Sequence, residues 1–208
     1  MTIDVQVRRL REREIPQATA MLARAFRDYS MGEFLSPDPS RRDAAMRWLF
    51  AASLRYGLRY GEVWAAVGQG GLIEGAAIWW APEFVEPDDD RAEETGLADG
   101  LLVVGPTVWS QLMEASQLRA ELHHRVAPDP HWYLDFLGVD LALQGHGIGS
   151  ALLQPMLDRL DADRLPAYLE TSAPRNLDYY PRFGFTLADE VAIPGRDRTF
   201  YAMRREPR

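Results

Sequence analysis

The chain has 208 residues, 47% of them hydrophobic and 26% charged, which is ordinary for a soluble globular protein with one well-formed core. A formal net charge of −8 argues against a general nucleic-acid binder and is compatible with a cationic ligand. The lack of cysteine excludes a disulfide framework, a thiolate metal site and a cysteine nucleophile. Because there is neither an apolar run of about 18 residues nor a signal-peptide-like start, we expect a cytoplasmic protein without a membrane partner.

The first elements follow from simple periodicities. Residues 3–10 alternate apolar and polar side chains and predict a strand. The apolar spacing after Pro16 predicts a helix that ends near residues 29–32. The pattern Ser40-x-x-Asp43 is typical of a capping box and predicts the start of a second helix.

The middle of the chain predicts a hairpin and a further helix. Residues 62–67 and 72–80 are expected to pair as two strands, and the acidic run 86–94 is expected to be a solvated loop or a helix start. A later helix ends at His123 and His124, which we interpret as complements to its dipole rather than as metal ligands. No repeat or internal linker separates these elements, so the whole chain (1–208) is expected to form one α/β domain.

The most informative stretch begins with a buried strand over residues 133–139. A short polar break follows, and then three alternating glycines, Gly145, Gly147 and Gly149, open a helix. The apolar residues of that helix at helical spacing are Ile148, Leu152, Met156, Leu157 and Leu160. The unpaired N–H groups of a first helical turn, together with the helix dipole, form an anion pocket suited to phosphate.

The remaining residues complete the predicted sheet. Residues 166–172 predict a short strand, and residues 186–204 predict a final hairpin. Pro155 lies about two turns inside the helix and is expected to bend it on its outer face, away from the core.

Three interpretations of the glycine stretch remain open on spacing alone. A dinucleotide fold would use G-x-G-x-x-G directly after its strand, with Glu170 as the distal acid. However, five residues separate Val139 from Gly145, and fewer than forty residues follow Glu170, which is too few to complete such a sheet. The other two interpretations are an acyltransferase phosphate loop and a glycine-rich turn with no ligand.

The chain resembles the GNAT acyltransferases, whose signature is Q/R-x-x-G-x-G/A at a strand-to-helix junction. Gln144, Gly147 and Gly149 match that signature at the expected place. Within the family, the block LETSAPRNLDYYPRFGF at residues 169–185 is similar to puromycin N-acetyltransferase-like enzymes. The resemblance covers nearly the whole chain, apart from an acidic insertion at residues 88–100.

The resemblance implies a mixed, mainly antiparallel sheet of about seven strands, with a splayed central pair and flanking helices. It also implies that acetyl-CoA lies in the splay and that no metal takes part. The pantetheine arm would pair with the strand backbone, and the diphosphate would lie on the amides of the glycine loop. The residues implied to contact acetyl-CoA are Leu137, Gly138, Val139, Gln144, Gly145, His146, Gly147, Ile148, Gly149, Ser150 and Asn176.

The catalytic candidates are two tyrosines and one glutamate. Tyr180 matches the family tyrosine beside the thioester sulfur and is the expected general acid, although a tyrosine at that spacing also suits a core. Glu170 lies in an apolar strand and is the expected base, unless it only forms a salt bridge with Arg175 or Arg182. Tyr29 is a further candidate for holding the amine or a relay water.

Two more features could shape the acceptor side. Strand alternation predicts that Asp135 lies on the same face as Leu137 and Val139, buried and paired. The Val139 N–H is the expected donor to the developing oxyanion. Aromatic residues that could line an acceptor pocket, or simply fill the core, are Trp48, Tyr56, Trp79 and Trp80.

These observations predict an acetyl-CoA-dependent N-acetyltransferase acting on a primary amine of a small molecule, such as an antibiotic or aminonucleoside, by direct attack in a ternary complex. The alternatives are a protein or peptide amine acceptor and a non-catalytic acyl-CoA-binding module. The protein is expected to be a monomer or homodimer without a nucleic-acid partner.

Overall fold

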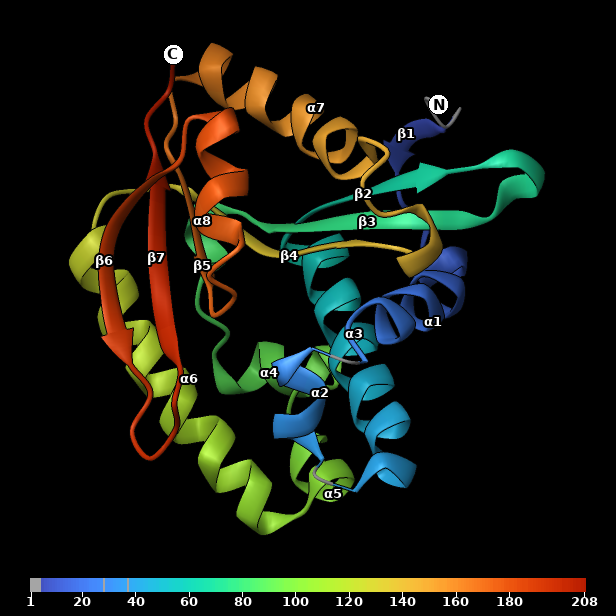
Figure 1. The fold of residues 1–208 in the computed structure, drawn as a ribbon, viewed down its shortest axis with the longest axis vertical. Coiled ribbons are helices and arrows are strands. Elements are labelled where there is room, and N and C mark those ends of the chain that lie inside the picture. Colours follow the sequence, from blue (N-terminus) through green and yellow to red (C-terminus); the bar gives the residue numbers. More distant parts are fainter. Residues whose placement is uncertain (1–4, 28, 37) are drawn as a thin grey trace.

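The computed structural model describes residues 5–27, 29–36 and 38–208, and places seven strands of these residues in one sheet (Figure 1). The strands are β1 (Gln6–Arg9), β2 (Gly61–Val67), β3 (Ile73–Trp80), β4 (Trp132–Val139), β5 (Ala167–Thr171), β6 (Thr186–Ala192) and β7 (Thr199–Arg205). Their order across the sheet is β1-β2-β3-β4-β5-β7-β6. All neighbouring strands are antiparallel except β4 and β5. The expected mixed sheet is therefore present, and a doubly wound dinucleotide fold, which needs consecutive parallel strands, is excluded.

Helices cover both faces of this sheet. They are α1 (Ile15–Ala25), α2 (Ser30–Leu35), α3 (Pro39–Tyr60), α4 (Asp89–Thr95), α5 (Gly100–Val104), α6 (Pro106–Val126), α7 (Ile148–Asp163) and α8 (Asn176–Tyr179). In Figure 1, α7 lies on one side of β2–β4, α1 and α3 lie on the other, and α6 runs along the β6–β7 half. Among the described residues, no helix is both long enough and apolar enough to cross a bilayer.

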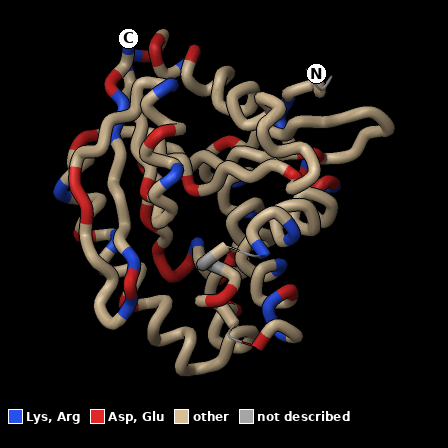
Figure 2. Tube along the Cα trace, in the orientation of Figure 1, with Lys and Arg blue, Asp and Glu red and all other residues tan. Residues whose placement is uncertain are grey.

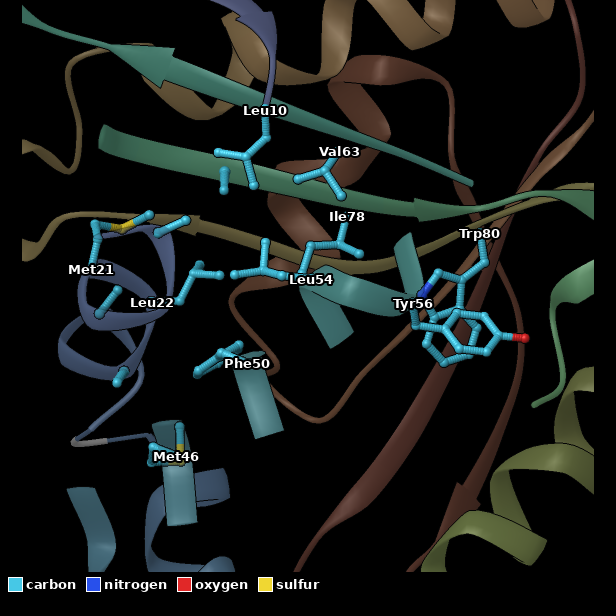
Figure 3. Packing of buried hydrophobic residues seen from close by; sticks show 14 of the residues in the cluster. Leu10, Met21, Leu22, Met46, Phe50, Leu54, Tyr56, Val63, Ile78 and Trp80 are labelled. Carbon is cyan, nitrogen blue, oxygen red and sulfur yellow. The ribbon is translucent and has the colours of Figure 1, made fainter. Parts of the chain in front are cut away.

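Alternating side chains of the central strands supply two hydrophobic cores. On one face, Val63 and Ile78 pack with Leu22, Phe50 and neighbouring residues of α1 and α3, as Figure 3 shows. On the opposite face, strand residues pack against the apolar stripe of α7, whose members are Ile148, Leu152, Leu153, Met156, Leu157 and Leu160. Burying both faces holds the sheet rigid, which fixes the strand ends where a site can form.

The sheet splits between β4 and β5. These strands pair only at Trp132↔Ala167 and Tyr133↔Tyr168, after which each continues without the other. In Figure 1, β2–β4 run across the view while β5–β7 run along its vertical, so the two halves diverge. The expected splay of the central pair is thus present, and it leaves one backbone edge of β4 open.

Some helices and strands begin or end at residues other than those predicted from the sequence. The first helix ends at Ala25 rather than near residues 29–32, and a separate short helix, α2, begins at Ser30. Asp38, not Ser40, caps α3: its carboxylate accepts hydrogen bonds from the Ser40 N–H at 2.9 Å and the Ser40 hydroxyl at 2.8 Å. The predicted strand at 3–10 is observed over Gln6–Arg9, and residues 1–4 lie outside the described part.

Charged residues are spread over the molecule. All 23 basic residues are arginines, and Figure 2 shows acidic and basic positions interspersed over the elements. Most ion pairs are exposed, such as Arg47 with Asp43 at 2.6 Å, and contribute little to stability. The buried charges described below are therefore the unusual ones.

Candidate active site

The glycine loop ends in an open helix N-terminus. Gly145 and Gly147 have φ angles of 81° and 86°, a region that favours glycine, and Gly147 is the N-cap of α7. A Cβ built on either glycine would meet no atom within 4 Å, so the space beside the loop is open. The N–H groups of Ile148, Gly149 and Ser150 precede the first intrahelical bond, which runs from Ala151 to Gly147 at 3.0 Å.

This geometry fits a diphosphate. Residues 144–147 are exposed, and the first turn of α7 carries no acidic side chain that would repel an anion. The His146 ring instead folds back on the loop, with Nδ1 lying 3.0 Å from the Gln144 carbonyl oxygen. Pro155 lies inside α7, and the helix remains continuous through it.

The open edge of β4 leads from this loop into the splay. The Asp140 N–H donates to the Glu74 carbonyl at 2.8 Å, toward β3, so strand alternation turns the backbone groups of Leu137 and Val139 toward the open side. The Val139 carbonyl there accepts a hydrogen bond from Gln144 Nε2 at 3.1 Å. Gln144 thus joins the loop to the strand edge, a role that the signature match alone did not indicate.

Gly138 lets α1 approach the back of this edge. A Cβ at Gly138 would lie 2.5 Å from Leu22 Cδ2 and 2.8 Å from Phe26 Cε2. The open edge is therefore supported from behind by packed side chains, and it is fixed before any ligand arrives.

Two tyrosines of the segment after β5 face α7. Tyr180 is 8% exposed and packs edge-on against Phe185 at 5.7 Å, and burial raises the pKa of its hydroxyl. Tyr179 contacts the start of α7, because a Cβ on Gly149 would lie 2.7 Å from the Tyr179 hydroxyl oxygen. Asn176 donates from Nδ2 to Thr171 Oγ1 at 2.7 Å, which ties α8 to the end of β5.

A β-bulge reverses the expected orientation of Asp135. Trp79 pairs with Leu134 and Ile78 pairs with Phe136, so Asp135 is the extra residue on β4. Leu137 and Val139 pack on the α7 side, whereas Asp135 turns to the other side, beside Arg119 of α6. The prediction that Asp135 shares a face with Leu137 and Val139 was therefore wrong, because a bulge breaks the period of two.

Asp135 is a partly exposed residue with an unusual carboxyl group. Burial raises its pKa from 3.8 to about 7, against the opposing effects of Arg119 and the Ser53 hydroxyl. Its Oδ2 is buried and has no hydrogen-bond donor among the described residues.

Glu170 lies on the same side and has an unexpected partner. Its side chain is 4% exposed and forms an ion pair with Arg119, with Oε2 3.6 Å from Nη2. Its Oε1 accepts a hydrogen bond from the Tyr168 hydroxyl at 3.1 Å. Arg119 also donates to the Tyr133 hydroxyl, and its pKa is raised by Tyr133 and by the two carboxylates. The predicted partners Arg175 and Arg182 are not in this ion pair.

Tyr29 contacts Arg175. The Arg175 guanidinium stacks over its ring at 4.6 Å from the centroid, joining the segment before α2 to the segment before α8. The structure therefore brings Tyr29 next to Arg175, the residue before Asn176 and α8.

The histidines do not act as the sequence suggested. His123 is buried and stacks on Tyr168 with centroids 4.3 Å apart, and its Nε2 lies 2.6 Å from Nε2 of His131. Burial lowers the pKa of His123 to about 3 and also lowers that of His131, so one neutral ring donates to the other. His124, by contrast, lies at the surface, 3.0 Å from Glu86. Across residues 5–27, 29–36 and 38–208, no group of three or more His, Asp or Glu side chains is arranged to hold a metal ion.

The tryptophan and tyrosine candidates for an acceptor wall are mostly core residues. Tyr56, Trp79 and Trp80 are buried, and Figure 3 shows the Tyr56 and Trp80 rings together at one end of the core. Trp48 packs against Trp109 and donates from Nε1 to the Gly96 carbonyl at 2.8 Å. These side chains shape the scaffold rather than the splay.

The site thus has two sides along the strands that part after Tyr133 and Tyr168: a glycine loop with exposed backbone at the end of β4, and a cluster of buried charges. An open strand edge next to a phosphate-type loop defines a class of α/β proteins that bind an extended, diphosphate-bearing ligand.

Comparison with known proteins names the family. The model of the acetyltransferase (GNAT) family matches residues 23–185, so the chain belongs to that family, and the predicted fold and enzyme class are confirmed. A curated N-acetyltransferase of Schizosaccharomyces pombe is 36% identical over 65 residues. That match spans 31% of this chain and only 26% of the relative.

Solved structures share the fold over almost the whole chain. One, described as histone acetyltransferase HPA2 and related acetyltransferase from Corynebacterium glutamicum, is 22% identical with a TM-score of 0.70, covering 99% of this chain and 98% of its own. A polyamine N-acetyltransferase of Drosophila melanogaster is 16% identical with a TM-score of 0.67, covering 98% and 100%.

Proposed function

We propose that the protein transfers the acetyl group of acetyl-CoA to the primary amine of a small molecule by direct attack within a ternary complex. The observation that carries this proposal is the junction of the open β4 edge with the N-terminus of α7. That junction offers backbone donors for a diphosphate and a strand edge for an extended arm in one continuous path.

On the coenzyme side, the proposed contacts are mainly backbone contacts. The amides of Gly145 to Ser150 would hold the diphosphate, and the open backbone groups of Leu137 and Val139 would pair with the pantetheine arm. Asn176 would contact that arm from α8. Holding the thioester in this way supplies much of the rate, because the amine then meets a fixed carbonyl carbon.

The chemistry needs one oxyanion donor and two proton transfers. The amine nitrogen attacks the acetyl carbonyl carbon, the C–N bond forms, and the C–S bond breaks. The Val139 N–H, turned to the open side, would donate to the carbonyl oxygen as negative charge develops on it. Tyr180, with its hydroxyl pKa raised by burial, would remain a protonated acid able to give its proton to the departing sulfur.

The acceptor is proposed to approach from the α6 side. Glu170 and Asp135 place two carboxyl groups there, whose oxygens can accept hydrogen bonds from an amine that arrives as an ammonium ion. Tyr29 is proposed to help position the acceptor through the contact that it makes with Arg175. Some structurally similar proteins are described as polyamine and agmatine N-acetyltransferases, which supports an amine acceptor at the level of the fold.

The most direct test is turnover on a panel of amines, followed by release of the free CoA thiol. The panel holds alkylamines, arylalkylamines, diamines, an aminonucleoside and a lysine-containing peptide. The aminonucleoside is puromycin-like, because residues 169–185 resemble puromycin N-acetyltransferase-like enzymes. We expect turnover of at least one small amine and weaker turnover of the peptide. Tight binding of CoA without turnover of any amine would favour a non-catalytic acyl-CoA-binding module, and peptide preference would overturn the small-molecule assignment.

A further inference from the structure

Two histidines form a buried pair that the proposed reaction does not use. His123 and His131 are 6% and 3% exposed, and their Nε2 atoms lie 2.6 Å apart. His123 lies near the C-terminal end of α6, and His131 directly precedes β4. Burying two ionisable rings side by side is costly unless both are neutral and hydrogen-bonded, so the arrangement calls for a reason.

The hydrogen bonds fix the tautomer of each ring. His131 Nδ1 lies 2.6 Å from the Asp129 carbonyl oxygen, which can only accept, so this nitrogen carries a hydrogen. Because burial lowers the pKa of both histidines, the rings are neutral at pH 7, and His131 Nε2 is left as an acceptor. The hydrogen between the two rings therefore belongs to His123 Nε2.

The surroundings keep the pair neutral. Besides burial, which is the largest effect, Arg119 lowers the pKa of His123 and Arg204 lowers that of His131, against an opposing effect of Asp129 on His131. The titratable and charged groups that face the pair are Arg119 and His124 of α6, Asp129 of the turn before β4, Tyr133 of β4, Tyr168 of β5 and Arg204 of β7.

The pair reaches the buried charges through Tyr168. The His123 ring stacks on the Tyr168 ring, with centroids 4.3 Å apart and planes within 3° of each other. The Tyr168 hydroxyl donates to Glu170 Oε1 at 3.1 Å. Arg119, one turn before His123 on α6, forms the ion pair with the other Glu170 oxygen at 3.6 Å. Both groups that hold Glu170 are thus placed by His123, one through the stack and one through the helix.

The pair also lies where the sheet begins to split. His131 is the residue before Trp132, and β4 pairs with β5 only at Trp132↔Ala167 and Tyr133↔Tyr168. In Figure 1, α6 runs along the half of the sheet that turns away from β4. The hydrogen bond from His123 to His131 therefore ties this helix to the start of β4.

We propose that His123 and His131 are positioning residues for the acceptor side of the splay, because their hydrogen bond fixes the Tyr168 ring and α6 and so holds the Glu170 carboxylate in place. This inference rests on the proposed acetyl transfer. No proton passes through the pair, and both rings keep their hydrogens throughout. The pair acts on the amine and not on acetyl-CoA, because Tyr168 belongs to one core and the α7 stripe to the other.

Three substitutions separate the hydrogen bond from the stack. His131→Leu removes the acceptor, and His131→Gln keeps an acceptor oxygen at a similar reach. His123→Phe keeps a ring on Tyr168 but removes the donor. His124→Phe is the matched control, because His124 is the next residue of the same helix but lies at the surface beside Glu86. Steady-state kinetics are measured with 2-phenylethylamine and with the panel amine that the wild type turns over fastest.

The losses are expected to be shared by the pair. His131→Leu and His123→Phe should each lower kcat/KM for the amine by about 10-fold, and the double variant by about 10- to 30-fold rather than by the 100-fold of two independent effects. His131→Gln should stay within about 3-fold of the wild type, and His124→Phe should equal it. KM for acetyl-CoA should stay within about 2-fold in every variant.

The wild-type protein provides a test that needs no variant. The chain has four histidines, so a two-bond ¹H–¹⁵N spectrum of the histidine-labelled protein resolves each ring. At pH 7 we expect His131 as the neutral Nδ1–H tautomer and His123 as the neutral Nε2–H tautomer. Saturation with the amine should shift the signals of both rings, and saturation with CoA alone should leave them in place.

Each outcome decides. Additive losses in the double variant, or equal losses in His131→Leu and His131→Gln, would overturn the inference while acetyl transfer stands. A charged ring in the pair at pH 7, or signals that the amine leaves in place, would overturn it as well, and this spectrum decides if the variants do not fold. If the wild type turns over no amine on the panel, the proposed function itself fails, whereas the tautomers can still be read.

Discussion

The two sides of the split sheet present different chemical groups, main-chain amides on one side and charged side chains on the other. On the α7 side, the proposed binding groups are main-chain amides of a glycine loop and a helix start, supported by a continuous apolar stripe. On the α6 side, they are charged side chains brought together from three elements that are distant in sequence, with Arg119 on α6, Asp135 on β4 and Glu170 on β5.

This difference separates the two halves of the proposed reaction. A backbone site holds a diphosphate without depending on particular side chains, so it can remain constant while the other side changes. A side-chain site can be altered by one substitution, which suits the recognition of different amines. Tyr180 packs with the α7-side core and Glu170 lies on the opposite face of the sheet, so acid and base reach the splay from opposite faces.

The largest expected effect concerns the stability of the charged side. The pKa of Asp135 is raised in the folded protein to about 7 from 3.8, so between these values the folded chain keeps a proton that the unfolded chain has lost. The stability contributed by this group is therefore complete below pH 4 and is lost as the pH rises through about 7.

At 1.36 kcal/mol per pKa unit, this loss has an upper bound of about 4 kcal/mol. The Asp135→Asn variant is expected to lack this loss of folding stability with rising pH. The measurement is the urea midpoint of wild type and variant from pH 4.5 to 8, taken as a difference because His123 and His131, with lowered pKa values, act in the opposite direction. Parallel curves for the two proteins would contradict the placement of Asp135.

The next effect concerns the acid. Tyr180→Phe is expected to lower kcat by about 10- to 100-fold while leaving the affinity for CoA unchanged, because only the proton for the departing sulfur is removed. Tyr179→Phe is the matched control. Its hydroxyl contacts the start of α7 beside Gly149, and we expect its kcat to stay within about 3-fold of the wild type. An equal loss in both variants would show that packing, not proton donation, explains Tyr180.

The smallest effect concerns the backbone side. Gly147→Ala is expected to destabilise the fold by about 1 kcal/mol, because an alanine must adopt a left-handed conformation there. It should also raise KM for acetyl-CoA by about 5-fold or more, since the amides that follow change direction.

Gly70→Ala provides the matched comparison for that variant. Gly70 has a φ of 76° in the β2–β3 loop and, like Gly147, has no atom within 4 Å of an added Cβ. The two variants should lose similar stability, measured as a shift in Tm, but only Gly147→Ala should lose coenzyme affinity. If both leave KM for acetyl-CoA unchanged, the loop does not hold the diphosphate.

The same contrast explains what the sequence could predict. The strand, loop and helix at residues 132–160 are contiguous, and their glycine spacing is sufficient to predict a backbone anion site. The sheet and its splay followed from a family resemblance that spans the chain, and the family model covers residues 23–185.

The charged side could not be predicted in the same way. Arg119 is a charged residue of the long helix α6, and only the fold brings it to Glu170. Asp135 was assigned to the wrong face, because the bulge opposite Trp79 has no signal in the local pattern. The burial of His123 against Tyr168 was missed for the same reason, since the partner lies on another element.

The central claim is that coenzyme and amine reach the splay from opposite faces of the sheet. A crystal structure of the protein with CoA and 2-phenylethylamine tests this most directly. The account predicts diphosphate oxygens about 3 Å from the amides of residues 147–150, and the amine nitrogen about 3 Å from an Asp135 carboxylate oxygen. A diphosphate bound away from that loop, or an amine on the α7 side of β4, would contradict it.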